Sequence, residues 1–286
     1  MYQITNELAS SFLPTRNSEF NKGSFGRVAL IVGSEKYPGA AMLALEAALR
    51  GGAGYVNYIG SLKLCRRLQL RSPEAIYTEL DYTARTDRAK ITSFTSRATS
   101  ILVGCGCDTS ESLMLLIAEL LLTDGAPVVL DADAINSIAA YGSAEIIKKS
   151  RRTVILTPHP LEFSRLSGLS VDEIQANRQS VAREFAREYG CILLLKGAGT
   201  VVTDGAEVYV NTTGSTALAK AGSGDVLAGL LASLLAFSRS PISSAALAAY
   251  VHGKAGDNLA LSLSEFGVTP SDLPVECAKI LADLGG

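Results

Sequence analysis

The chain has 286 residues, 48% of them apolar, and its 26 basic residues nearly balance its 28 acidic ones. A chain of this size can bury a large core, in one α/β domain or two small ones. No basic stripe indicates a nucleic-acid partner. The longest apolar stretch, 226–237, is shorter than the roughly 18 residues that a bilayer span needs, so we expect a buried core helix there.

The cysteines and the amino terminus both indicate a reducing compartment. The five cysteines are irregularly spaced and odd in number, and the chain holds only two histidines, which argues against a structural zinc site. Residues 1–7 lack the basic and apolar regions of a signal peptide. We therefore expect reduced thiols and a cytoplasmic protein.

Short β-branched runs alternate with helical segments along the chain. The runs lack polar alternation, which is typical of parallel strands covered on both faces. This rhythm predicts an α/β fold with a mostly parallel sheet and helices on both of its faces. The predicted strands are 28–32, 55–59, 101–103, 128–130, 154–156 and 192–195, and the predicted helices between them are 40–50, 110–122, 133–140 and 171–188.

The last third of the chain departs from that alternation. Residues 200–203 and 207–210 flank an Asp-Gly-Ala turn and predict a β-hairpin. Helices are then expected at 225–237, 241–263 and 271–284. Because neither a repeat nor a linker occurs, we expect residues 1–286 to form a single domain.

The segment 213–225 (TGSTALAKAGSGD) is the most informative part of the sequence. Gly222 and Gly224 allow a tight turn and a close approach to a ligand. The first amides of the helix that follows lack partners within the helix and carry positive dipole character. A phosphate placed there would receive several N–H bonds at once, so we expect an anion site at Gly222, Ser223 and Gly224.

Asp225 lies at the mouth of this expected anion site. A carboxylate at a helix start is often only an N-cap. Next to a bound phosphate, however, a negative side chain is costly unless it has a task, and accepting the proton of a substrate hydroxyl is one. We therefore interpret Asp225 as the catalytic carboxylate. The segment is not a Walker A loop, and 33–39 (GSEKYPG) replaces the G-x-G-x-x-G of a dinucleotide-binding strand turn.

Six sets of residues, in the same order along the chain, resemble the carbohydrate-kinase-like domain of NAD(P)H-hydrate repair dehydratases, within the ribokinase-like superfamily. Each set is weak alone, but together they span most of the chain. They are 22–28 (KGSFGRV), 39–41 (GAA) with 50–54 (RGGAG), 130–136 (LDADAIN), 157–163 (TPHPLEF), 195–200 (LKGAGT) and 221–229 (AGSGDVLAG).

The resemblance implies a ribokinase-like fold and a nicotinamide-nucleotide repair reaction. The family dehydrates the S epimer of hydrated NADH or NADPH at the expense of a nucleotide, so this chain is expected to be a hydro-lyase with Mg²⁺ as cofactor. Bacterial-type members use ADP, giving AMP and phosphate, and we expect ADP as the co-substrate. Some members carry an epimerase domain in front, which we do not expect here. Family members also often form tetramers, so a homotetramer is expected.

Site residues follow from the resemblance by position. For the hydrate substrate they are Ala40, Gly104, Gly106, His159 and Asp225, and for the nucleotide they are Lys196, Gly197, Ala198, Gly199, Thr200, Gly222, Ser223 and Gly224. Taken alone, 196–200 is better explained as a strand-end turn with a solvated lysine, but beside the other matching sets the nucleotide assignment of Lys196 is favoured. His159 is as readily a capped loop before a helix. His252, on an apolar helix, is interpreted as a core histidine with satisfied hydrogen bonds.

Three features leave the chemistry open. Asp131 and Asp133 at a strand end could serve Mg²⁺, directly or through water, although Asp133 is nearly as well explained as a helix N-cap. The loop 104–108 (GCGCD) replaces the usual Gly-Pro-Gly-Leu-Gly, so Asp108 adds a carboxylate that could repel phosphate. Ser215 stands where Asn is more usual.

Two other functions fit part of the pattern. A ribokinase-like small-molecule kinase, such as a hydroxyethylthiazole or pyridoxal kinase, shares the Gly-x-Gly-Asp but not 22–28 and 157–163 together. A non-catalytic nucleotide sensor would be expected to lose the aspartate, and Asp225 is present.

Overall fold

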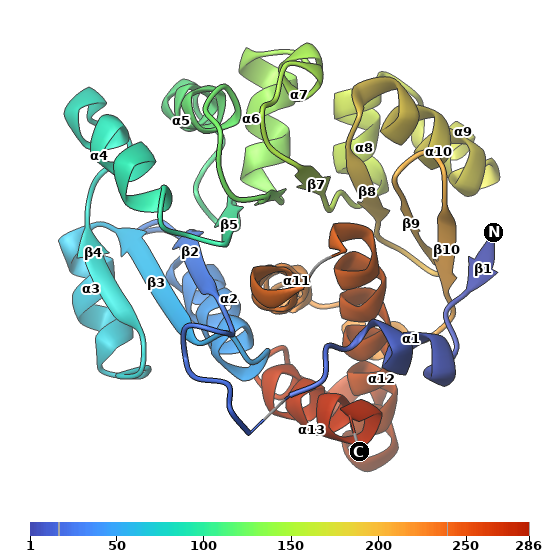
Figure 1. The fold of residues 1–286 in the computed structure, drawn as a ribbon. Helices are drawn as coiled ribbons and strands as arrows, with labels where there is room; N and C mark the ends of the chain where they lie inside the picture. The colour runs from blue at the N-terminus through green and yellow to red at the C-terminus, as the bar shows by residue number, and fades with distance from the viewer. Residues whose placement is uncertain (17, 239, 286) are drawn as a thin grey trace.

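The computed structural model describes residues 1–16, 18–238 and 240–285. Within these residues, ten strands form one sheet in the order β1-β10-β9-β8-β7-β6-β5-β2-β3-β4 (Figure 1). Their bounds are β1 Tyr2–Gln3, β2 Arg27–Ile31, β3 Tyr55–Gly60, β4 Ile76–Glu79, β5 Ser100–Val103, β6 Val128–Leu130, β7 Val154–Leu156, β8 Ile192–Leu195, β9 Thr200–Thr203 and β10 Val208–Asn211.

The sheet is mostly parallel, as predicted. Strands β2 to β8 pair in parallel with their neighbours, and β1 pairs in parallel with β10. Only β9 runs against its two neighbours, because it forms the predicted hairpin with β10. The carboxyl ends of the parallel strands β2 to β8 therefore meet at one edge of the sheet, where α/β folds bind their ligands.

Helices cover both faces of the sheet, which confirms the predicted fold class (Figure 1). One face carries α1 Asn6–Phe12, α2 Pro38–Arg50, α3 Leu62–Gln69, α11 Ser223–Phe237, α12 Pro241–Gly267 and α13 Leu273–Gly285. The other carries α4 Arg85–Thr95, α5 Glu111–Leu121, α6 Asp133–Tyr141, α7 Glu145–Lys148, α8 Pro160–Ser167, α9 Val171–Ala176 and α10 Arg178–Tyr189.

Alternate residues of one strand enter two separate cores. In β2, Val28 and Leu30 pack on the α2 and α11 side, whereas Ala29 and Ile31 pack on the α5 side. Side chains of a strand alternate between the two faces of a sheet, and here both faces are apolar. This double burial is the physical reason that the predicted runs lack polar residues.

Helix α11 is buried on nearly all sides, as expected for the stretch 226–237. It lies along α2, and a side chain at Gly229 would come within 2.2 Å of the carbonyl oxygen of Ala44. Small residues on both helices therefore allow their backbones to approach closely. This packing fixes the start of α11 against the carboxyl edge of the sheet.

Several element boundaries differ from the prediction. The expected helix 171–188 is two helices, because Asn177 has non-helical dihedral angles between α9 and α10. Helix α12 continues to Gly267 across a non-helical Ser264. Strands β1 and β4 and helices α1, α3, α4 and α7 were not predicted. Helix α11 begins at Ser223 rather than at Asp225.

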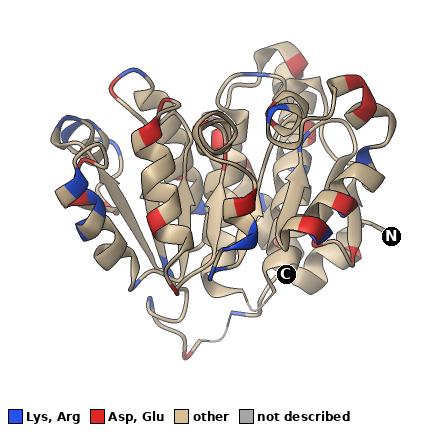
Figure 2. Cartoon of the chain, turned by 90° about the horizontal axis from the view of Figure 1, so that it is seen from above, with Lys and Arg blue, Asp and Glu red and all other residues tan. Residues whose placement is uncertain are grey.

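Charge is mixed over the surface. Figure 2 shows Lys and Arg interspersed with Asp and Glu over the elements of both layers. No helix in the described ranges combines the length and hydropathy required to cross a bilayer. All five cysteines lie among the described residues, each buried and each a free thiol.

Candidate active site

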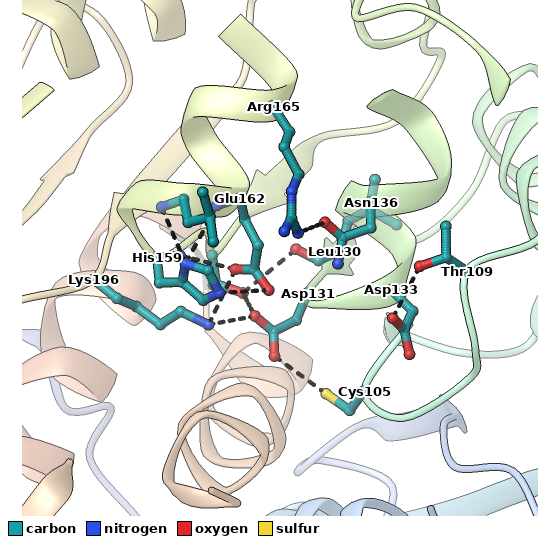
Figure 3. Close-up of polar contacts among 12 residues, drawn as sticks. Cys105, Thr109, Leu130, Asp131, Asp133, Asn136, His159, Glu162, Arg165 and Lys196 are labelled. Atoms are coloured by element: carbon teal, nitrogen blue, oxygen red, sulfur yellow. Dashed lines mark hydrogen bonds and ion pairs between the residues drawn. The ribbon is translucent and has the colours of Figure 1, made fainter. Parts of the chain in front are cut away.

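Three neighbouring strands end immediately before a polar residue at the carboxyl edge of the sheet. Asp131 follows β6, Thr157 follows β7 and Lys196 follows β8. The hydroxyl of Thr157 donates to Oδ1 of Asp131 at 2.7 Å. Nζ of Lys196 donates to the same oxygen at 2.8 Å (Figure 3). Burial lowers the pKa of Lys196, but the carboxylates of Asp131 and Glu162 outweigh burial and raise this pKa to about 12. The result is a buried ion pair between the ends of β6 and β8, on either side of β7.

Cys105, from the loop after β5, joins this ion pair. Its Sγ lies 3.4 Å from Oδ2 of Asp131 (Figure 3). Burial, and then the charge of Asp131, raise the pKa of the Cys105 thiol well above its usual value, so the group stays a protonated donor. One ligand atom each of Cys105, Asp131 and Asp225 lie within 4.8 Å of one another. The structure thus places Asp225 beside a carboxylate that is already neutralised by Lys196.

Asp225 is the third residue of α11 and is partly buried. Burial, followed by the charge of Asp131, raises the pKa of Asp225 to about 6, against the opposing charge of Lys196. A carboxyl group with such a pKa is ionised at neutral pH yet is a stronger base than an exposed aspartate. Its environment therefore suits proton acceptance.

The N-cap of α11 is Gly222, in the left-handed region at φ 104°, and no side chain caps the helix. The alternative that Asp225 is merely the N-cap is therefore wrong. The amide of Ser223 donates to the carbonyl of Lys220 at 3.2 Å. The backbone amides of Gly222 and Gly224 have no hydrogen-bond acceptor among the described residues. Two of the three expected phosphate donors are thus unused, and the third is engaged in a turn.

A cleft of about 460 Å³ opens at this helix start. Ala221, Gly222 and Asp225 line it from the α11 side. Its other lining residues come from the loop before α2, the first turns of α2, the loop after β5 and the start of α6; they are Lys36, Tyr37, Pro38, Gly39, Ala40, Leu43, Gly106 and Asp133. Ala40, Gly106 and Asp225 of the expected substrate set therefore lie together in one cleft.

The glycines of the loop after β5 permit this close assembly. Gly104, at φ 122°, would place a side chain 2.1 Å from the carbonyl oxygen of Asp131. Gly106, at φ 63°, would meet the Cβ of Ala40 at 2.7 Å. Each position requires glycine on both conformational and steric grounds. Gly104 supports the cleft from below and does not line it.

His159 is the N-cap of α8. Its Nδ1 accepts from the amides of Leu161 and Glu162, both at 3.2 Å. Burial, followed by the charge of Lys196, lowers the pKa of His159, so its ring is neutral with the proton on Nε2. Nε2 lies 3.4 Å from the carboxylate of Glu162 (Figure 3). The capping alternative thus accounts for Nδ1. The ring is half exposed, but His159 is not among the residues that line the cleft at Asp225.

The expected nucleotide segment follows Lys196 at the end of β8. Gly197 and Gly199 have φ values of 136° and 66°, which favour glycine, and nothing lies within 4 Å of a side chain built at Gly199. The hydroxyl of Thr200 donates to the carbonyl of Gly197 at 2.9 Å and closes the turn around Ala198. A side chain built at Gly224 would approach Nζ of Lys196 at 3.4 Å, so this turn adjoins the α11 start.

The acids do not form a magnesium cage by themselves. Mg²⁺ prefers oxygen ligands, whereas the cluster of Cys105, Asp131 and Asp225 includes a thiol, and Lys196 already holds Asp131. Asp133 accepts from the amide of Asp108 at 2.9 Å and from Thr109 at 3.1 Å. Asp133 is the first residue of α6 and Ala132 is its N-cap, so the N-cap alternative for Asp133 is wrong.

His252 is buried on α12, as expected, but it is not satisfied. Its Nε2 has no hydrogen-bond partner, and neither has the buried Oγ of Ser223. Burial lowers the pKa of His252 to about 4, so the ring is neutral, and the opposing effect comes from the backbone of Ser223. The ring therefore lies against the first turn of α11, beneath the expected anion site.

Comparison with known proteins identifies the family to which this chain belongs. The family model described as NAD(P)H-hydrate dehydratase matches residues 28–279. The chain belongs to this dehydratase family. It is 36% identical over 251 residues to the ADP-dependent (S)-NAD(P)H-hydrate dehydratase of Bacillus subtilis, an alignment that covers 87% of this chain and 86% of that one.

A longer relative and a solved structure agree with this placement. The bifunctional NAD(P)H-hydrate repair enzyme of Moorella thermoacetica is 36% identical over 277 residues, or 94% of this chain. The chain spans about half the length of that relative, 52%. The crystal structure of the Bacillus subtilis ADP/ATP-dependent NAD(P)H-hydrate dehydratase, co-crystallised with ATP/Mg²⁺, has a TM-score of 0.87 at 30% identity and covers 98% of this chain and 97% of its own.

The departures from the dehydratase pattern have physical explanations. Asp108, where the family usually has glycine, sits at φ 62°, a left-handed conformation that aspartate tolerates better than most residues. Its carboxylate is paired with Lys36 at 3.4 Å. Ser215 caps a short 3-10 turn by accepting from the amide of Ala217. Neither substitution touches the start of α11.

Sequence reasoning did not single out Thr157, Glu162, Arg178 or Cys105 as partners of the expected residues. Arg178 donates to the carbonyls of Leu195 and Lys196 and so fixes the end of β8. A signal existed for Thr157, because it directly follows a buried strand, as Asp131 and Lys196 do. Arg178 is the first residue of α10, 17 and 18 residues before its two partners, and no short-range pattern identifies such a contact.

Proposed function

We propose that this protein dehydrates the S epimer of hydrated NADH or NADPH, using ADP as co-substrate and releasing AMP and phosphate. The activity belongs to the named relatives, and the geometry supports it here. One observation carries the proposal: Asp225, a carboxylate with a raised pKa, stands in a cleft beside the unused amides of Gly222 and Gly224.

Hydroxide is a poor leaving group, and the site offers a way to replace it. Asp225 accepts the proton of the hydrate's hydroxyl, and that oxygen attacks the terminal phosphorus of ADP, which expels AMP. The phosphorylated carbon then loses phosphate with help from the lone pair of the ring nitrogen. A proton leaves the neighbouring carbon and the double bond is restored. Amides of Gly222 and Gly224 stabilise charge on the transferred group.

We assign the two ligands to adjoining parts of the site around Asp225, and His159 and Lys196, which both approach the carboxylate of Glu162, lie where the two parts meet. Ala40, Gly106 and His159 face the hydrate, with Gly104 shaping that wall from below. Lys196, the turn of Gly197, Ala198, Gly199 and Thr200, and the loop of Gly222, Ser223 and Gly224 hold the nucleotide. Lys196 adjoins both its turn and the α11 start, which suits contact with phosphate.

Magnesium enters this proposal as a companion of the nucleotide. Mg²⁺ retains several water ligands and commonly binds through substrate phosphates with one or two carboxylates. Because the oxygens of Asp131 and Asp133 already have protein partners, we propose that ADP brings the ion. No step of the reaction above is assigned to it.

The test is recovery of the reduced-nicotinamide absorbance when enzyme and Mg²⁺ are mixed with the S hydrate and ADP, with ATP in a parallel reaction. We expect recovery with ADP and equimolar AMP and phosphate. Absence of recovery with either nucleotide would contradict the proposal. A stable phosphorylated product from another alcohol would instead indicate a ribokinase-like kinase, and nucleotide binding without turnover would indicate a sensor.

We further propose that residues 1–286 act as one domain, that the chain forms a homotetramer and that it works in the cytoplasm. One sheet runs through the described residues, which supports the first point. Five unpaired thiols suit a reducing compartment. Light scattering measures the oligomeric state directly, and we expect a single species with the mass of a tetramer.

A further inference from the structure

The charged residues of the cleft beside Asp225 are mostly acidic, although the proposed substrate is negatively charged. Two of its charged lining residues, Asp133 and Asp225, are acidic, and Lys36 is the one basic residue among the lining residues that the structure describes. A hydrated dinucleotide carries a diphosphate with two negative charges. Such a ligand requires a cation near the point where its diphosphate passes the carboxylates.

Lys36 stands at the rim of the cleft in the loop before α2. Its Nζ lies 3.4 Å from Oδ1 of Asp108, and the Lys36 and Asp108 side chains are 67% and 43% exposed. The same Nζ lies 4.8 Å from the centroid of the Tyr37 ring. An ion pair this exposed is weak and exchanges partners readily. Lys36 is thus held at the cleft but remains available to a stronger anion.

The surroundings of Lys36 favour an anion at the same place. Helix α2 begins at Pro38, its N-cap Tyr37 makes no side-chain capping bond, and its first turn contains no acidic residue. Gly39 and Ala40, in this first turn, also line the cleft. The cation and the positive end of a 13-residue helix therefore face one space that is continuous with Asp225.

Asp108 is fixed opposite Lys36 by its own backbone. Its amide donates to Asp133 at 2.9 Å, and its left-handed conformation, at φ 62°, directs the turn. The carboxylate of Asp108 thus pairs with the ammonium group of Lys36, which a bound diphosphate would also need.

We propose that Lys36 binds the diphosphate of the hydrated dinucleotide and that Asp108 competes with the substrate for this lysine. The inference rests on the proposed function for the identity of the ligand. It makes Lys36 a binding residue for one substrate and leaves the chemistry at Asp225 unchanged. Asp108 acts through Lys36 and so tunes affinity.

Three variants test the inference by equilibrium binding of NADH, followed by its fluorescence, because the reaction product carries the same diphosphate. We expect Lys36→Met to weaken NADH binding about tenfold, the usual effect of losing one charge-assisted bond. Asp108→Asn, which tolerates the left-handed conformation, should tighten binding more than about twofold by releasing Lys36. Lys63→Met is the matched control, because the Lys63 side chain is also more than half exposed and pairs with Glu35 outside the cleft.

A second set of titrations distinguishes the two ligands that carry a diphosphate, the dinucleotide and ADP. Titrating ADP instead of NADH should give the same affinity for wild type and Lys36→Met, because no residue of the nucleotide turn 196–200 lines the cleft that contains Lys36. Raising the salt concentration should weaken NADH binding more steeply for wild type than for Lys36→Met. A loss confined to ADP would overturn the inference and assign Lys36 to the nucleotide.

The inference is overturned if Lys36→Met binds NADH within about twofold of wild type, or if Asp108→Asn binds it more weakly. These binding results do not depend on turnover. Failure of wild type to restore absorbance from the hydrate would instead count against the proposed function. If both hold, Lys36→Met should raise KM for the hydrate with kcat nearly unchanged.

Discussion

Nζ of Lys196 lies 2.8 Å from Oδ1 of Asp131, and Asp131 in turn adjoins both Cys105 and Asp225. The side chain of Asp131 is only 2% exposed, and that of Lys196 is 18% exposed. The pair joins two strand ends that are 65 residues apart in the sequence. It places one positive charge between two carboxylates and thereby allows Asp225 to ionise in a buried position.

Breaking this pair from one side should be costly. We expect Asp131→Asn or Lys196→Met to lower the free energy of unfolding by about 3 kcal/mol, because each leaves a buried charge without its partner. The double variant should lose much less than the sum of the two, since no charge is then stranded. Urea unfolding of the four proteins measures the coupling. Additive losses would show that the two side chains do not stabilise each other.

The pH dependence of turnover should report Asp225. Its pKa is raised to about 6, so kcat/KM should fall as the pH drops through 6 and level off above it. The direction follows because the base must be ionised to accept a proton. Steady-state rates with saturating nucleotide across this range measure the midpoint. A profile that stays flat well below pH 6 would remove Asp225 from the role of base.

The same carboxyl should make the protein less stable as pH rises. A group whose folded-state pKa is raised contributes stability below its unfolded pKa of 3.8 and loses it as the pH passes 6. At neutral pH, the free energy of unfolding of Asp225→Asn should therefore exceed that of wild type by on the order of 2 kcal/mol, and the variant should unfold at a higher temperature. The gain should disappear in acid. Equal stability at both pH values would mean that burial does not penalise the charge.

His159 should separate its capping and ligand roles. We expect His159→Ala to lower the free energy of unfolding by about 1 kcal/mol, because the amides of Leu161 and Glu162 lose their acceptor. Asparagine is a good N-cap, so His159→Asn should restore most of that stability. If the ring also faces the hydrate, both variants should raise KM for the hydrate. Normal KM values in both would leave His159 with the capping role alone.

The sheet was predictable because most of its strands are buried on both faces. Continuous apolar runs such as β6 and β8 mark such strands directly. Strand β4 escaped because it lies at the sheet edge and its terminal residues Ile76 and Glu79 are exposed, which breaks the apolar pattern. The break at Asn177 escaped because the helical spacing of apolar residues continues across it.

The site was predictable where local backbone geometry matters and less so where partners come from afar. The glycines at 222 and 224 mark a helix start whatever the rest of the chain does. The contacts of Lys196 with Asp131 and of Cys105 with Asp131 depend on which strands become neighbours. Strand order is a property of the whole fold, so short segments of sequence do not contain it.

The most direct test of the account follows the oxygen of the substrate's hydroxyl. The hydrate is prepared with a heavy oxygen isotope in that hydroxyl, incubated with enzyme, Mg²⁺ and ADP, and the released phosphate is analysed by mass spectrometry. We expect one heavy oxygen in each phosphate, because Asp225 deprotonates the hydroxyl for attack on phosphorus. Heavy oxygen in water, with unlabelled phosphate, would show that the hydroxyl never reaches the nucleotide and would contradict the central claim.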